Sequence, residues 1–151
     1  MIKYISGNLF DSNCQTLVNT VNCVGVMGKG IALQFKNKFP DMFLLYRKLC
    51  NEEKFFPGCL WLWKPSEISM FTQNQQVLCF ATKNHWRYNS QIEWIEHGLR
   101  TFVTTYKQKG ITSIAFPKLG CSNGHLNWNT QVKPLMEKYL SRCDIPIEIY
   151  I

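Results

Sequence analysis

Short apolar segments rich in β-branched residues alternate along this chain with segments whose apolar residues recur at helical spacing. The alternation predicts strands over residues 2–5, 16–21, 58–63, 76–82, 111–116 and 145–151. It predicts helices over residues 30–38, 42–51, 90–109 and from 127 or 128 to about 140. Because strands and helices interleave, we expect an α/β fold built as a sandwich of three layers. At 151 residues, without internal repeats or linkers, the chain is expected to be a single domain, residues 1–151.

The stretch from residue 16 to residue 35 is the one around which the other segments are organised. A buried strand leads into a loop with Gly25, Gly28 and Gly30, and a helix follows. Such a loop at a helix N-terminus directs backbone N–H groups towards an anion. Its spacing is neither G-x-G-x-x-G nor that of a Walker A loop, and Asn19 and Asn22 offer donors and acceptors to sugar hydroxyls. The stretch predicts a pocket for a sugar phosphate or a dinucleotide, unless these residues only shape the turn.

The chain is basic, with a formal net charge of +7 and a pI near 9.1. This excess of positive charge favours a polyanionic partner or a phosphate-bearing ligand. The basic residues are spread along the chain without a run, so a solvated basic surface explains the charge about as well. Charge alone therefore does not assign the protein to the nucleic-acid-binding class.

The seven cysteines contain no C-x-x-C pair, so neither a zinc site nor a disulfide framework is indicated. Scattered thiols are typical of proteins in a reducing cytosol. The N-terminus enters a strand pattern without a signal peptide, and no apolar run approaches the ~18 residues of a membrane helix. We therefore expect a cytoplasmic protein with no metal site and no membrane contact.

Residues 82–88 follow a predicted strand and are dense in reactive and aromatic side chains. Trp86 and Tyr88 could stack on a base, and Arg87 could hold a phosphate. Lys83 could act as a nucleophile if its amine were neutral, and the nearby charge of Arg87 would lower its pKa. On these residues alone, a basic surface loop with an aromatic anchor is the favoured interpretation.

Four segments, in order along the chain, carry a resemblance to a known family. They are ISGNL at residues 5–9, VNTVNCVGVMGKGIALQFK at 18–36, TKNHWR at 82–87 and PKLGC at 117–121. The chain closely resembles macrodomains, and among them the branch that contains the DNA ADP-ribosyl glycohydrolase antitoxin DarG and the human terminal ADP-ribose protein glycohydrolase. The resemblance covers nearly the whole chain and implies a three-layer α/β/α sandwich with a central mixed sheet.

The resemblance implies ADP-ribose as the ligand, with its diphosphate held between two facing loops. The adenine would meet Leu9 and Asn8, which stands in place of the acidic residue of many macrodomains. Asn22 would orient the distal ribose at the reacting carbon. The other residues expected to contact ADP-ribose are Asn19, Gly28, Lys29, Gly30, Ile31, Thr82, Gly120, Cys121, Ser122, Asn123, Gly124 and His125.

The resemblance also implies the reaction. Lys83 matches the family's catalytic lysine, which attacks the anomeric carbon of the distal ribose without a metal or a cofactor. The substrate would be ADP-ribosylated DNA, modified at thymidine. The residues that would face the nucleic acid are His85, Trp86, Arg87 and Tyr88. The implied partner is a DNA ADP-ribosyltransferase toxin, whose modification the enzyme reverses.

One position departs from the human protein glycohydrolase, whose second loop has an aspartate that helps proton transfer. That position is Gly124 here, as in DarG, and His125 follows it. The absence of this aspartate favours a nucleic-acid substrate. The imide nitrogen of thymine is already acidic, so thymine needs less help from protonation to leave. His125 could carry a proton near neutral pH, or it could be an exposed residue without a role. Two other functions stay open: hydrolysis of protein-linked or O-acetyl ADP-ribose, and a reader module that binds ADP-ribose without catalysis.

Overall fold

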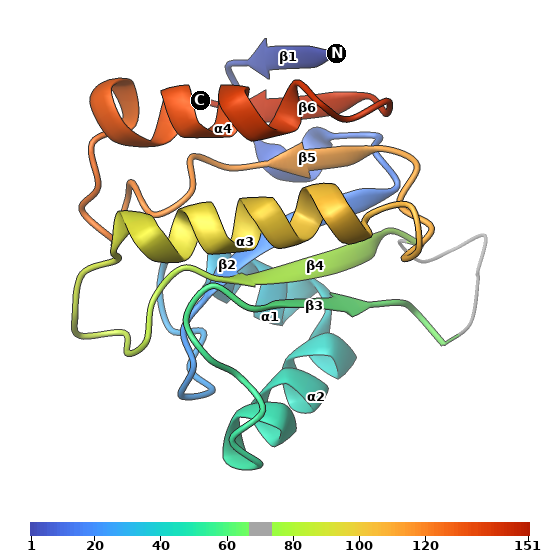
Figure 1. Cartoon of the computed structure of the whole chain (residues 1–151). Helices are drawn as coiled ribbons and strands as arrows, with labels where there is room; N and C mark the ends of the chain where they lie inside the picture. Colours follow the sequence, from blue (N-terminus) through green and yellow to red (C-terminus); the bar gives the residue numbers. More distant parts are fainter. Residues whose placement is uncertain (67–73) are drawn as a thin grey trace.

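The computed structural model describes residues 1–66 and 74–151 (Figure 1). The strands are β1 (Ile2–Ile5), β2 (Thr16–Val21), β3 (Leu60–Trp63), β4 (Gln76–Ala81), β5 (Ile114–Phe116) and β6 (Ile147–Tyr150). The α-helices are α1 (Gly30–Lys38), α2 (Pro40–Asn51), α3 (Ile92–Thr105) and α4 (Lys133–Leu140). A 3-10 turn covers Leu9–Asp11, and a π-helical turn covers Trp128–Val132. Within the described part of the chain, no helix is long and apolar enough to cross a membrane.

The strands form one sheet in the order β1-β6-β5-β2-β4-β3. Each pair of neighbours is parallel except β3 and β4, which are antiparallel, so the sheet is mixed as predicted. Helices α3 and α4 cover one face of the sheet, and α1 and α2 cover the other (Figure 1). These three layers confirm the predicted α/β/α sandwich.

Each face of the sheet has its own hydrophobic core. Between the sheet and helices α3 and α4, the fully buried rings include Phe80, Phe102 and Phe116. On the other face, α1 and α2 bury Phe35 and Tyr46 completely. In β3 the two leucines face the first core and the two tryptophans face the second, as the alternation in the sequence predicts.

Several element boundaries differ from the prediction. We expected α2 to begin at Met42, which is wrong: Pro40 opens the helix and Phe39 is its N-cap. Proline suits this position because the N–H group of the first helical residue has no acceptor within the helix. Strand β5 begins at Ile114 rather than at residue 111, because its ladder with β6 begins only there.

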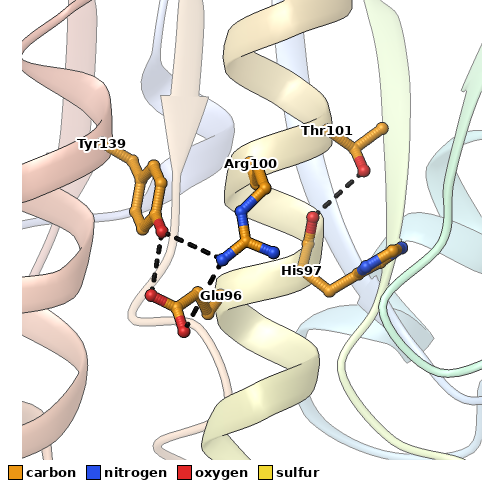
Figure 2. Close-up of polar contacts among 5 residues, drawn as sticks. All are labelled: Glu96, His97, Arg100, Thr101 and Tyr139. Carbon is orange, nitrogen blue, oxygen red and sulfur yellow. Dashed lines mark hydrogen bonds and ion pairs between the residues drawn. The ribbon is translucent and has the colours of Figure 1, made fainter.

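Tyr139 joins α4 to α3 by a polar contact (Figure 2). Its hydroxyl donates to Glu96 Oε2 at 2.8 Å and accepts from Arg100 Nη2 at 3.4 Å. His97 lies on the other side of α3 in this view, and its ring packs against Phe56 at a centroid distance of 6.2 Å. These side chains connect helices and loops away from the pocket described next.

Candidate active site

A pocket opens where the carboxyl ends of the parallel strands meet. Strands β4, β2, β5 and β6 are neighbours and run in one direction, so the segments that follow them lie at the same edge of the sheet. The pocket has a volume of about 920 Å³. The predicted site residues that line it are Asn22, Gly28, Lys29, Ile31, Thr82, Lys83, Trp86, Arg87, Gly120, Cys121, Ser122, Asn123, Gly124 and His125. The structure therefore brings together the first ligand loop (residues 22–29), the second ligand loop (residues 117–126) and the Lys83 segment (residues 83–88).

The charged side chains that line the pocket are basic. They are Lys29, Lys83, Arg87 and Lys118. Within the described residues, no aspartate or glutamate lines the pocket. The lining therefore favours an anionic ligand and offers no carboxylate as a general acid or base.

Lys83 and Asn22 lie next to each other because their strands pair in register. Val21, the last residue of β2, is the ladder partner of Ala81, the last residue of β4. Beyond the strands, the N–H groups of Thr82 and Lys83 both donate to Val21 O, at 3.0 and 3.3 Å. Residues more than sixty positions apart in the sequence therefore line one side of the pocket.

The amine of Lys83 is held by a bond within its own segment. Lys83 Nζ donates to Trp86 O at 3.0 Å. Burial lowers the pKa of Lys83, and the charge of Lys29 lowers it further. We expected Arg87 to be the cation that lowers this pKa, which is wrong: its guanidinium lies 5.4 Å from the centroid of the Trp86 ring. A lowered pKa increases the fraction of neutral, nucleophilic amine.

The side chain of Asn22 closes the first ligand loop. Its Oδ1 accepts from Val24 N at 3.1 Å and from Val26 N at 3.3 Å. Its Nδ2 donates to Val26 O at 2.8 Å. The second N–H of Nδ2 has no partner within residues 1–66 and 74–151 and can serve a ligand in the pocket.

Helix α1 begins at the wall of the pocket. Gly30, its first residue, has φ +56°, and Lys29 at the N-cap makes no capping bond with its side chain. The first N–H groups of the helix are thus available to an anion. A Cβ at Gly30 would lie 3.3 Å from Asn123 Nδ2, so the start of α1 meets the second ligand loop here.

The second ligand loop turns back on itself and leaves no room at Gly124. A Cβ at this position would overlap with Ser90 Oγ and with the carbonyl oxygen of Gly120. The loop therefore cannot hold, without shifting, the aspartate that the human protein glycohydrolase has at the matching position. His125, the next residue, is exposed and has φ +63°, a conformation that is uncommon for residues other than glycine.

The rings of the Lys83 segment form an exposed aromatic cluster. His85 packs against Trp86 and Tyr88 at centroid distances of 5.1 and 5.6 Å. Its Nδ1 accepts from Arg87 N at 3.0 Å, which shapes the turn. Trp86 is 48% and Tyr88 63% exposed, so both rings have free faces. Trp86 and Arg87 line the pocket, whereas His85 and Tyr88 lie outside its lining.

Some predicted contacts with ADP-ribose lie outside the pocket lining. Asn8 Oδ1 accepts from Phe10 N at 3.0 Å and caps the 3-10 turn in which Leu9 is buried. Asn19 is fully buried, with its Nδ2 3.7 Å from Met27 Sδ. Gly30 also lies outside the lining. The contacts of these residues with ADP-ribose stay predictions, as do those of the residues that line the pocket.

Seven residues that line the pocket were not among the predicted site residues: Thr20, Val21, Val26, Ala32, Pro117, Lys118 and Tyr150. Tyr150 is the last residue of β6 and pairs with Ile5 of β1, next to the segment expected to meet the adenine. An aromatic residue at the end of the last predicted strand was the signal that could have found it. Lys118 lies within the PKLGC segment itself.

All seven cysteines are free thiols. Cys121 lines the pocket, and burial raises the pKa of its thiol to about 11, so it is protonated at neutral pH. Among the residues that the structure describes, no group of three or more His, Cys, Asp or Glu side chains could hold a metal ion. Lys83 lines the same pocket, and its role as the nucleophile stays a prediction.

Comparison with known proteins agrees with this geometry. The model of the Macro domain family matches residues 18–134. A DNA ADP-ribosyl glycohydrolase of Mycobacterium tuberculosis is 38% identical over 99% of this chain and 42% of its own length. A DNA ADP-ribosyl transferase-DNA ADP-ribosyl glycohydrolase fusion protein of Thermosipho africanus is also 38% identical, over 99% of this chain and 42% of its own length. The chain thus spans less than half the length of these relatives.

Solved structures extend the similarity. The macrodomain of Thermus aquaticus DarG has a TM-score of 0.90 and 37% identity, with 100% of this chain and 98% of that chain covered. Thermosipho africanus DarTG, solved in complex with ADP-ribose, has a TM-score of 0.91 and 40% identity over 99% of this chain and 41% of that chain. The chain therefore belongs to the macrodomain family and is similar over its whole length to the macrodomains of DarG proteins.

Proposed function

We propose that this chain hydrolyses the bond between ADP-ribose and a DNA base, which we expect to be thymine, with Lys83 as the nucleophile. The observation that carries the proposal is a lysine of lowered pKa at a pocket whose charged lining is basic. The names of the relatives at 38% identity support DNA as the carrier of the ADP-ribose. The transferase fused to the Thermosipho relative supports a DNA ADP-ribosyltransferase as the partner whose modification is reversed.

The two ligand loops suit a diphosphate flanked by riboses. The open N-terminus of α1 supplies N–H groups, and Lys29 adds a full positive charge beside them. Opposite them, Gly120 and Gly124 let the second loop approach closely because neither has a side chain. Asn22 completes this part of the site with its remaining N–H, directed in our proposal at a hydroxyl of the distal ribose.

The proposed reaction has two displacement steps at the anomeric carbon of the distal ribose. In the first, the neutral amine of Lys83 forms a bond to this carbon while the bond from the carbon to the base nitrogen breaks. The bonding electrons leave with the base, which takes up a proton from water, and the new ammonium on Lys83 loses one to water. In the second step, water attacks the same carbon while the bond from this carbon to Lys83 Nζ breaks. The proton that the attacking water loses goes to Nζ, so that Lys83 is a neutral amine again and ADP-ribose is released. The protein supplies the nucleophile and its orientation.

The absence of a carboxylate from the described pocket lining bears on the leaving group. Without a carboxylic acid as proton donor, a leaving group that is stable as an anion departs most easily. The imide nitrogen of thymine meets this condition, because its negative charge spreads over two carbonyl groups. The pocket chemistry therefore supports a base-linked substrate.

The exposed aromatic cluster supports contact with the DNA on either side of the modified base. Trp86 lines the pocket and is half exposed, so its ring can stack on a neighbouring base while ADP-ribose occupies the pocket. Arg87, stacked on Trp86, can pair with a backbone phosphate. An isolated ADP-ribose would use neither contact.

The test is an oligonucleotide with one ADP-ribosyl thymidine, followed on a denaturing gel. Wild type should remove the adduct, whereas Lys83→Ala should be slower by about a thousandfold and still bind ADP-ribose by calorimetry. Lys109→Ala is the matched control, because Lys109 is also partly buried with a lowered pKa but lies outside the pocket lining. This control should cleave like wild type.

Each other outcome has a definite meaning. Removal by Lys83→Ala at the wild-type rate would keep the activity and refute the lysine mechanism. An adduct left intact by wild type, with ADP-ribose still bound, would refute DNA glycohydrolysis. A peptide with ADP-ribosyl glutamate would then distinguish a protein glycohydrolase from a reader.

A further inference from the structure

Helix α2 contacts the first ligand loop at two points. Tyr46 on α2 is fully buried, and its hydroxyl oxygen lies 2.8 Å from both Asn22 O and Asn22 Oδ1. At Gly25, a Cβ would meet Arg47 Cγ at 3.3 Å and Cys50 Cβ at 3.5 Å, so the loop backbone lies directly on the helix. A helix whose described residues do not line the pocket thus contacts the loop that forms one wall of it.

The bonds around Asn22 define the orientation of its amide. Oδ1 faces the N–H groups of Val24 and Val26, and Nδ2 faces the carbonyl of Val26. The hydroxyl of Tyr46 adds a donor on the Oδ1 side. A flipped amide would place Nδ2 against these donors, so the observed orientation is the one that satisfies all of them. It leaves one N–H of Nδ2 for a ligand.

Tyr46 is suited to this role because it stays a donor. Burial raises the pKa of its hydroxyl far above the ordinary value, and the nearby thiols of Cys50 and Cys79 raise it further. The hydroxyl has one hydrogen to donate, and both acceptors within reach, the backbone oxygen and Oδ1, belong to Asn22. Either bond therefore attaches Asn22 to α2. The bond is shielded from water, which makes its loss costly.

We infer that Tyr46 is a positioning residue: its hydroxyl holds Asn22 and the first ligand loop on α2, so that Asn22 presents its free N–H to the distal ribose. The ribose in this statement rests on the proposed function, whereas the bracing of the loop does not. The bond links the second core, where α2 packs, to the geometry of the pocket wall.

The competing explanation is that Tyr46 only fills the core. Its ring packs against Phe43 and Phe55 at centroid distances of 6.3 and 5.2 Å. Tyr46→Phe separates the two explanations, because it keeps the ring and removes only the hydroxyl. Tyr139→Phe is the matched control: it removes a hydroxyl that also bonds at 2.8 Å between two elements, to Glu96 on α3, away from the pocket (Figure 2).

The first measurement is amide hydrogen exchange at Val24 and Val26, whose N–H groups donate to Asn22 Oδ1. Tyr46→Phe should accelerate exchange at both amides by about tenfold, whereas Tyr139→Phe should leave both unchanged. Unchanged exchange in Tyr46→Phe would overturn the inference, because the loop would then hold its shape without the hydroxyl.

The second measurement separates catalysis from binding. Tyr46→Phe should slow single-turnover removal of the DNA adduct by about tenfold while the Kd for ADP-ribose rises by only about threefold. A rate equal to that of Tyr139→Phe would overturn the inference, and so would equal losses in rate and affinity.

If wild type leaves the adduct intact, the proposed function fails. Amide exchange and the Kd for ADP-ribose then decide the role of Tyr46: faster exchange with a raised Kd supports bracing of the pocket, and no change in either refutes it.

Discussion

The first ligand loop and the Lys83 segment line the same pocket but are held in different ways. The first ligand loop is closed by the amide of Asn22 and braced by the buried Tyr46 of α2. The side-chain bonds of the Lys83 segment run mostly within it, from Lys83 Nζ to Trp86 O and from Arg87 N to His85 Nδ1. Its rings are exposed rather than packed under a helix.

The difference corresponds to the two kinds of contact that the proposed substrate requires. A diphosphate and a ribose present the same atoms in every turnover, so a wall braced by buried side chains can match them closely. The DNA around the modified base varies in sequence, and exposed rings stack on any base. Changes in the braced wall should therefore impair ADP-ribose binding, whereas changes in the exposed cluster should impair only the DNA reaction.

Of four substitutions that test this difference, Gly124→Ala should have the largest effect, because the second ligand loop packs too closely at Gly124 to accept a side chain. The added Cβ would overlap with Ser90 and with the backbone of Gly120, so the loop must shift. We expect ADP-ribose affinity to fall by more than about tenfold and stability to fall by about 1–3 kcal/mol. Calorimetry and thermal unfolding measure the two effects. Gly98→Ala, which overlaps with the Phe80 ring outside the pocket lining, should lose stability but keep its affinity. Wild-type affinity in Gly124→Ala would mean that the close packing at Gly124 does not determine the shape of the binding site.

Trp86→Ala should have the next largest effect and should separate the reaction on DNA from the binding of ADP-ribose. It removes an exposed ring but keeps the backbone carbonyl that holds Lys83 Nζ. We expect kcat/KM for the DNA adduct to fall by about tenfold, with ADP-ribose affinity within about twofold of wild type. Phe56→Ala is the control, because Phe56 is 55% exposed and lies outside this pocket. An equal loss of ADP-ribose affinity in Trp86→Ala would remove the distinction between the two regions.

Lys29→Gln tests the connection between the two regions, because Lys29 in the first ligand loop lowers the pKa of Lys83. Without this charge the pKa of Lys83 rises, so less of the amine is neutral at a given pH below that pKa. The ascending limb of kcat against pH should move to higher pH, and kcat at neutral pH should fall a few-fold. Lys118→Gln is the control, because it removes another cation of the pocket that does not act on the pKa of Lys83. In this variant the ascending limb of kcat against pH should stay where it is in wild type. If the ascending limb of kcat against pH stays at the same pH in Lys29→Gln, the lysine mechanism is contradicted.

His125→Asn should have the smallest effect. His125 is exposed at φ +63°, and asparagine adopts this conformation more readily than most residues. If His125 has no role in proton transfer, the rate on the DNA adduct should stay within about twofold of wild type. A loss of about tenfold in the rate, with the loop intact by amide exchange, would instead assign proton transfer to His125.

Local chemistry explains which parts of the site could be predicted. The glycine-rich loop after β2 and the Lys83 segment after β4 are contiguous in sequence, and glycine spacing and side-chain type are visible there. Tyr46 could not be predicted in this way, because nothing in α2 distinguishes a core tyrosine from one whose hydroxyl reaches a loop. Its place in α2 predicts ordinary packing, and the structure adds a bond to Asn22.

The order of strands and helices along the chain and the glycine-rich loop after β2 were determined by the sequence alone, because periodicity and backbone freedom are local properties. The sequence identified Lys83 and the second ligand loop only through the resemblance to macrodomains. Tertiary structure alone decided that Lys29 rather than Arg87 acts on Lys83, and that Gly124 has no room for a side chain. These contacts depend on the strand order, on the register of β2 with β4 and on how the loops pack. Such long-range geometry results from the packing of the whole domain, which no single segment encodes.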